Sequence, residues 1–195
     1  MPKLWNQTVE AHRREVRDAI LDTTAALVAE HGLRPVTMSQ IAEQTGIGRA
    51  TLYKYFSDVE AILVAWHDRH VSAHLAHLAA VRDRIADPTQ RVESVLTACA
   101  HINFEVAKQH HGAELTALLH HDQHIAAARR RLHTLIRDVL ADGAKAHGIR
   151  HDLPADELAT FCQHALAAVS DLPSKAAIGR LVTVTMSALK PQGDQ

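Results

Sequence analysis

The sequence has few of the residues that interrupt helices, and it has no clear strand runs. Among its 195 residues there are only 8 glycines and 6 prolines, while helix formers such as Ala, Leu, Arg and Glu are frequent. This pattern predicts a helix content well above the usual third of a globular protein. We therefore expect an all-α protein, and the composition argues against folds built on β-sheets.

Cysteine and long apolar runs are also scarce. Cys99 and Cys162 are the two cysteines, far apart in the chain, which fits a reducing compartment better than a disulfide framework. No apolar stretch approaches the roughly 20 residues of a membrane span. The N-terminal residues MPKLWNQTVEAHRR lack the apolar core of a signal peptide. We expect a cytoplasmic protein with no membrane partner.

Neither positive nor negative charge predominates, because the formal net charge is −1. Residues 1–56 carry seven Lys and Arg against six Asp and Glu. This balance excludes a broadly basic surface, so any affinity for nucleic acid must rest on a few well-placed cations and a docked helix.

The most informative stretch is residues 37–63, TMSQIAEQTGIGRATLYKYFSDVEAIL. Thr37 followed by Gln40 forms a capping box, which predicts a helix start. The apolar residues that follow have helical spacing, and Gly46 supplies the left-handed backbone that ends a helix. A second helix starts near Gly48. Two short helices around a glycine turn are typical of a helix-turn-helix.

The second of these helices has two different faces. Leu52, Tyr55 and Phe56 lie mainly on one side, while donors and small residues lie on the others. Small residues near the helix start allow close approach to a major groove about 12 Å wide. Ser57 with Glu60 predicts a second capping box, so the next helix begins at once.

The segment resembles the DNA-binding signature of TetR-family transcriptional regulators, over residues 13–65. The matching residues are Met38, Ile41, Ala42, Gly46, Ile47, Thr51, Leu52, Tyr53, Tyr55, Phe56, Glu60, Ala61, Ile62 and Leu63. The resemblance and the outward face together give the DNA-binding residues Thr37, Ser39, Gly48, Arg49, Ala50, Thr51, Tyr53, Lys54 and Tyr55. One departure is Val59, where many members carry a lysine. The resemblance implies a phosphate contact by that lysine, and we expect Lys3, Arg13 or Arg14 of the N-terminal region to compensate for its absence.

Helical periodicity and turn residues divide the rest of the chain. We expect a mobile arm over residues 1–11, a helix-turn-helix domain over 12–57, and a ligand-binding and dimerisation domain over 58–195. About nine helices are predicted. Outside residues 37–56 they cover 13–31, 58–85, 87–112, 113–121, 122–147, 154–170 and 173–189.

The resemblance implies a homodimer joined through the last two helices, which are rich in alanine. It also implies a ligand-responsive regulator, most simply a repressor, that binds a near-palindromic double-stranded DNA operator and is released by a small-molecule effector. Candidates for the effector pocket, chosen by position, are Trp66, His70, His74, Cys99, Phe104, Leu118, Leu119, His133 and Phe161.

Histidine is unusually frequent, with 16 residues. His67, His70, His74 and His77 share a sector of one predicted helix, and His120, His121 and His124 form a second cluster. A metal- or pH-responsive regulator is therefore an alternative. An enzyme is a minor alternative, because Cys99, His101 and Glu105 match no catalytic spacing. We expect no catalytic residue, no metal site and no cofactor.

Overall fold

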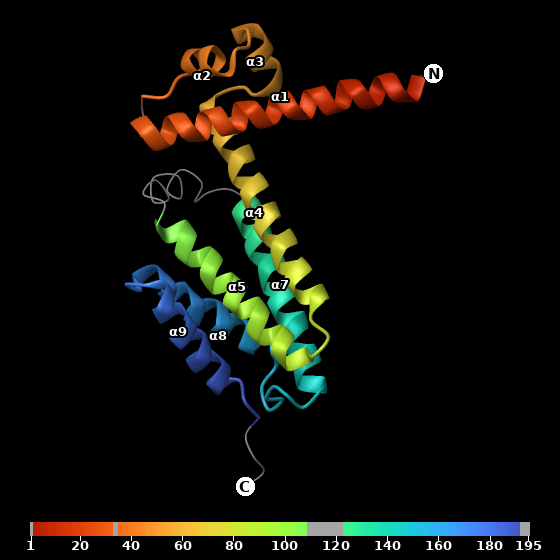
Figure 1. Ribbon diagram of the computed structural model, residues 1–195, viewed down its shortest axis with the longest axis vertical. Coiled ribbons are helices and arrows are strands. Elements are labelled where there is room, and N and C mark those ends of the chain that lie inside the picture. The colour runs from red at the N-terminus through yellow and green to blue at the C-terminus, as the bar shows by residue number, and fades with distance from the viewer. Residues whose placement is uncertain (1, 33–34, 109–122, 192–195) are drawn as a thin grey trace. The chain divides into compact units, whose positions relative to one another are not determined.

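The computed structural model of the chain describes residues 2–32, 35–108 and 123–191 (Figure 1). The predicted helix over 113–121 and its residues Leu118, Leu119, His120 and His121 lie outside these ranges, as does the side chain of His124. Every element in the described part is a helix, so the predicted all-α class is confirmed.

The helices follow the predicted order. Their bounds are α1 (Pro2–His31), α2 (Met38–Thr45), α3 (Arg49–Tyr55), α4 (Val59–Arg84), α5 (Pro88–Lys108), α7 (Gln123–Lys145), α8 (Ala155–Ala167), the 3-10 helix η1 (Ala168–Asp171) and α9 (Lys175–Ala188). None of them is both long and apolar enough to cross a membrane, as far as the described residues go.

The chain divides into two compact units, and the division falls inside α4 between His70 and Val71. The first unit contains α1, α2, α3 and the start of α4. Its core is formed by apolar side chains from all four helices and the loop before α2, namely Ile20, Leu21, Leu27, Val28, Val36, Met38, Ile41, Ala42, Leu52, Phe56, Ile62 and Leu63. Burial of these side chains holds the short helices α2 and α3, which are too short to be stable alone.

The helix α1 begins earlier than predicted. Residues 1–11 were expected to form an arm, but the helix is continuous from Pro2 to His31. Proline is accepted in the first helical turn, and no glycine or further proline follows before Gly32. Gly32 has φ of 81° and its amide donates to the Val28 carbonyl at 2.9 Å, so the predicted helix end is confirmed. Whether this region moves in solution stays a prediction.

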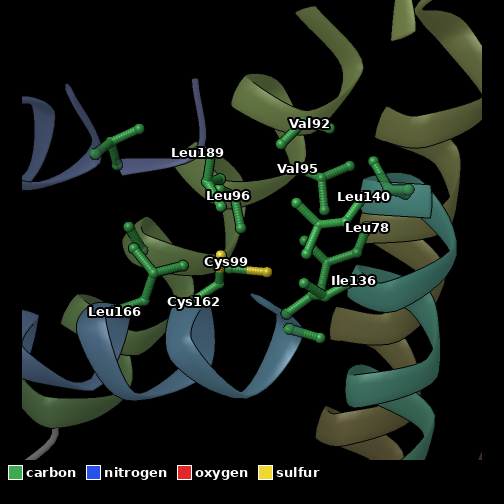
Figure 2. Packing of buried hydrophobic residues seen from close by; sticks show 14 of the residues in the cluster. Leu78, Val92, Val95, Leu96, Cys99, Ile136, Leu140, Cys162, Leu166 and Leu189 are labelled. Atoms are coloured by element: carbon green, nitrogen blue, oxygen red, sulfur yellow. The ribbon is translucent and has the colours of Figure 1, made fainter. Parts of the chain in front are cut away.

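The second unit is built around α5, which packs against α7, α8 and α9. Its core joins Leu96 and Cys99 of α5 to Cys162 and Leu166 of α8, with Ile136 of α7 beside them (Figure 2). Both cysteine side chains lie in this apolar core. Both thiols are free and buried, as is usual for cysteines that serve as small apolar side chains.

The helix α7 ends two residues before the end of its predicted span of 122–147. The helix stops at Lys145, and His147 takes the left-handed conformation with φ of 59°. Gly148 is required because a Cβ there would lie 1.8 Å from Thr89 Oγ1 at the start of α5. The glycine therefore permits close packing of the α7–α8 loop on α5.

Candidate nucleic-acid interface

The helix α2 begins and ends as its sequence predicts. The Thr37 amide donates to Gln40 Oε1 at 2.9 Å, and the Gln40 amide donates to Thr37 Oγ1 at 3.3 Å. This is a complete capping box. At the other end Gly46 has φ of 72°, and the Ile47 amide donates to the Ala42 carbonyl at 3.0 Å. The turn between α2 and α3 is thus fixed by backbone geometry.

The helix α3 starts at Gly48, whose carbonyl accepts from the Thr51 and Leu52 amides at 2.9 and 3.0 Å. No side chain caps this end. Leu52 is fully buried and Phe56 is buried, so they fix the inward face of α3 on the core. The Arg17 guanidinium of α1 lies 5.4 Å from the centre of the Phe56 ring, which adds a cation–π contact behind the helix.

The outward face of α3 carries the predicted DNA-binding side chains. Arg49, Ala50, Thr51, Tyr53 and Lys54 are all exposed. Tyr53 is 50% exposed, so its phenolic hydroxyl is accessible from the surface. Two cations and a phenol on one exposed helix can reach base edges and phosphate oxygens.

The remaining predicted DNA-binding residues surround this face. Gly48, Thr37 and Ser39 are exposed near the starts of α3 and α2. Tyr55 is half-buried and packs against the core of the first unit. Its ring therefore supports α3 and leaves only part of the side chain available to a ligand. DNA contact by these residues stays a prediction.

The start of α4 is capped by Asp58, and the predicted box between Ser57 and Glu60 is wrong. Asp58 Oδ1 accepts from the Ala61 amide at 2.8 Å, while Ser57 Oγ donates to Asp58 Oδ2 at 2.8 Å. These bonds, with the Ala61 amide first, lower the pKa of the Asp58 carboxyl. An ionised carboxylate accepts a stronger hydrogen bond than a hydroxyl, so Asp58 displaces Ser57 as the cap. Val59 is half-buried against the same core.

One structural contact of the first unit was missed by sequence reasoning. Arg69 of α4 donates through Nη1 to Asp18 Oδ1 at 3.1 Å and through Nη2 to Asp22 Oδ1, both on α1. The only sequence signal is the spacing of the two aspartates one turn apart on α1. The partner lies 47 and 51 residues away, which a local pattern cannot show.

The predicted effector residues have different environments. Cys99 and Phe104 are buried in the core of the second unit, at 4% and 1% exposure. Phe161 is 45% exposed on α8. His133 of α7 bridges to α8, with Nδ1 2.9 Å from Gln163 Oε1 and Nε2 3.0 Å from Asp156 Oδ1. These two hydrogen bonds, with Gln163 first, raise the pKa of His133.

The other described candidates lie along α4. The rings of Trp66 and His70 stack with centroids 4.1 Å apart in the first unit, and His74 is half-buried in the second. Two surface hollows of the described residues, both in the second unit, include none of the predicted effector residues. The predicted effector site thus stays a prediction.

The metal-responsive alternative gains no support from the described residues, and the pH-responsive alternative stays a prediction. In the described part of the chain, no three His, Cys, Asp or Glu side chains gather in a way that could hold a metal ion.

Two of the residues weighed for an enzyme have structural surroundings. Glu105 pairs with Lys175 of α9, with Lys175 Nζ 2.8 Å from Glu105 Oε1. Burial raises the pKa of the Cys99 thiol to about 12, so this cysteine is unsuited to nucleophilic chemistry near neutral pH.

Comparison with known proteins agrees with this geometry. Residues 20–66 match the family model described as bacterial regulatory proteins, tetR family. The chain is 28% identical over 154 residues to the HTH-type transcriptional repressor KstR2 of Mycobacterium tuberculosis, which covers 74% of each protein.

Solved structures share the fold. A TetR/AcrR-family regulator from Thermobifida fusca has a TM-score of 0.74 at 16% identity, over 87% of this chain and 96% of that one. FadR of Bacillus subtilis, in complex with stearoyl-CoA, has a TM-score of 0.68 at 17% identity, over 88% and 98%. Residues 20–66, with the α2–turn–α3 geometry, therefore correspond to the tetR-family regulatory region, and the described chain shares the fold of TetR-family regulators.

Proposed function

We propose that the chain is a one-component repressor that binds a near-palindromic operator as a homodimer and is released by a small-molecule effector. The observation that carries operator binding is the outward face of α3. Tyr53 is 50% exposed between Arg49 and Lys54. Within the described residues, none of these three side chains has a hydrogen-bond or ion-pair partner inside the protein. They are available to meet phosphate and base edges.

Dimerisation through α8 and α9 is supported by apolar side chains that their own unit does not cover. Phe161 of α8 is 45% exposed and Val184 of α9 is 67% exposed. Ala167 and Ala176 are exposed on the same helices, while Ala159 and Ala177 are buried within the unit. Exposed large apolar side chains beside small ones suit a self-complementary helix interface. Two copies then present two α3 helices to two half-sites.

An effector and a repressor role are supported by the relatives. KstR2 is named a repressor, and the FadR structure of similar fold contains stearoyl-CoA. An effector lowers operator affinity when it binds the DNA-free arrangement of the dimer more tightly than the DNA-bound one.

Operator binding is tested by selecting a duplex from a random library with the wild-type protein and then measuring variants on it. Tyr53→Ala and Arg49→Ala should each weaken binding by at least about tenfold, which corresponds to the loss of roughly 1–3 kcal/mol per contact. Lys145→Ala is the matched control, because it removes an exposed cation of the second unit. The proposal fails if the α3 variants bind as tightly as the control while keeping wild-type helicity.

Dimerisation is tested separately by Phe161→Glu, which places a charge at the proposed seam. Sedimentation velocity should show a shift from dimer to monomer, because an unpaired buried charge is costly. Thr160→Glu adds the same charge at an exposed neighbouring position of α8 and should cause the smaller shift. Equal shifts, or an unchanged dimer in both variants, would place the interface elsewhere.

A further inference from the structure

A surface hollow of about 500 Å³ lies in the second unit between the end of α4 and residues 127–138 of α7. Its lining includes none of the residues predicted to bind DNA or an effector. Its lining consists of Arg82, Ala127, Arg130, Arg131, Thr134, Leu135 and Asp138. Three of these seven side chains carry a guanidinium group, which is an unusual concentration of positive charge in a chain with a net charge of −1.

Packing of α7 on the core holds the backbone that carries most of the lining residues. Ala127, Arg130, Arg131, Thr134 and Asp138 recur at three- and four-residue spacing, which places them along one side of the helix. The adjacent side is anchored in the core by the buried residues Leu135, Ile136, Val139 and Leu140. The arginines therefore project from a backbone held in place by packing, which reduces the cost of organising a binding site.

The charges of the lining are only partly neutralised. Arg82 Nε donates to Asp83 Oδ1 at 2.8 Å, and Asp138 accepts from Arg137 Nη2 at 2.7 Å. Arg130 and Arg131 are exposed, and no carboxylate of the described chain pairs with either. The lining contains three arginines and one aspartate, so its formal charge is about +2.

We propose that this hollow binds a small molecule carrying two neighbouring anionic groups, such as a diphosphate or a dicarboxylate. Each guanidinium offers a planar fork of donors that matches a phosphate or carboxylate. The Thr134 hydroxyl supplies another donor, while Ala127 and Leu135 give an apolar floor. A volume of about 500 Å³ falls within the range of small-ligand sites.

A small anion fits this hollow better than a nucleic acid. Asp138 lies in the lining, and Asp138 and Asp142 both act electrostatically on Arg82. These carboxylates would repel an extended phosphate backbone, which needs a continuous row of cations. A compact ligand can contact Arg130, Arg131 and Arg82 while avoiding Asp138.

The test is isothermal titration calorimetry of the full chain with sodium pyrophosphate and, separately, with sodium succinate. Sodium chloride at equal ionic strength gives the reference for unspecific screening. At least one of the two anions should bind saturably to the wild-type protein. The variant with Arg130→Gln and Arg131→Gln should bind at least about tenfold more weakly, since two charge-assisted contacts are removed.

Arg129→Gln is the matched control, because Arg129 is an exposed arginine of the same helix outside the hollow. The Arg129→Gln variant should bind the anion within about twofold of the wild-type affinity. Arg82→Gln, on α4, should weaken anion binding as the double variant of α7 does. Pyrophosphate binding assigns a phosphate ligand and succinate binding a carboxylate. The proposal is overturned if neither anion exceeds the chloride reference, or if Arg129→Gln loses as much affinity as the double variant. No step uses DNA, so this result is independent of the operator test.

Discussion

Arg69 of α4 and Asp18 of α1 form an ion pair with Nη1 and Oδ1 3.1 Å apart, and the same guanidinium also binds Asp22. One cation therefore joins two carboxylates that lie one helical turn apart. The Arg69 side chain is 29% exposed, so the pair is partly shielded from solvent. This contact braces the start of α4 against the helix that lies behind α2 and α3.

We predict that Arg69→Met lowers the free energy of unfolding by about 1 kcal/mol, since Asp18 and Asp22 would face each other without a cation. High salt should reduce this difference, because screening weakens both the pair and the repulsion left behind. Urea denaturation at low and high salt measures it. Arg84→Met is the control, because in the described part of the chain Arg84 donates only to the Ala80 carbonyl. A difference that does not change with salt would show that packing, and not charge, is what Arg69 contributes.

Gly148→Ala should destabilise the second unit, because the new Cβ would lie 1.8 Å from Thr89 Oγ1. Overpacking of this kind usually costs about 1–3 kcal/mol. Thermal unfolding of Gly148→Ala, Thr89→Ala and the double variant measures the coupling. In the Thr89→Ala background the glycine substitution should cost less, since the closest atom is gone. Strictly additive effects would mean that the two residues do not clash.

The bridge from His133 to Gln163 and Asp156 should make stability depend on pH. Both hydrogen bonds favour the protonated ring and raise its pKa above the usual value near 6.5. A raised pKa means that the folded state gains stability below the unfolded-state pKa and loses it as pH rises through the folded-state pKa. Burial of the ring and, less strongly, the charge of Arg137 lower the pKa of His133, but they do not outweigh the two hydrogen bonds.

The melting temperature of wild type minus that of His133→Gln should therefore fall as pH rises from below 6.5 toward 8. Melting curves of both proteins across this range measure the difference. His164→Gln serves as the control, because His164 is exposed on α8. A difference between wild type and His133→Gln that is constant with pH would contradict a protonated bridge.

The thiols of Cys99 and Cys162 should not react in the folded protein near neutral pH. Burial raises the pKa of both to about 12, so almost no thiolate is present. An aromatic disulfide reagent should label both cysteines of the chain in urea and neither within minutes in native buffer. Fast labelling of the native protein would show that the core opens readily.

The local signals that the sequence carries strongly are those that the structure reproduces. Thr37 with Gln40 and the glycine at 46 define α2, because a capping box and a left-handed residue are determined by neighbours in the chain. Apolar spacing likewise identified the inward face of α3, where Leu52 is buried. The outward set from Arg49 to Lys54 follows from the same periodicity.

Other features depend on residues that are distant in the chain or on competition between neighbours. Ser57 and Asp58 are both residue types that cap helices well. Asp58 caps α4 because its carboxylate is a stronger hydrogen-bond acceptor than the Ser57 hydroxyl. The need for glycine at 148 comes from Thr89, and the bridge at His133 comes from α8. The spacing of Arg130, Arg131 and Thr134 was visible, but the opposing Arg82 could be found only by folding the chain.

The ends of α3 are defined by the backbone of Gly48 and by the buried Phe56, so its exposed side chains take no part in holding the helix. Positions 49, 50, 51 and 54 are therefore free to change with little loss of stability. Gene duplication followed by substitution at these positions gives a short evolutionary route to new operator preferences, and sister regulators with diverged targets need not be less stable than their ancestor.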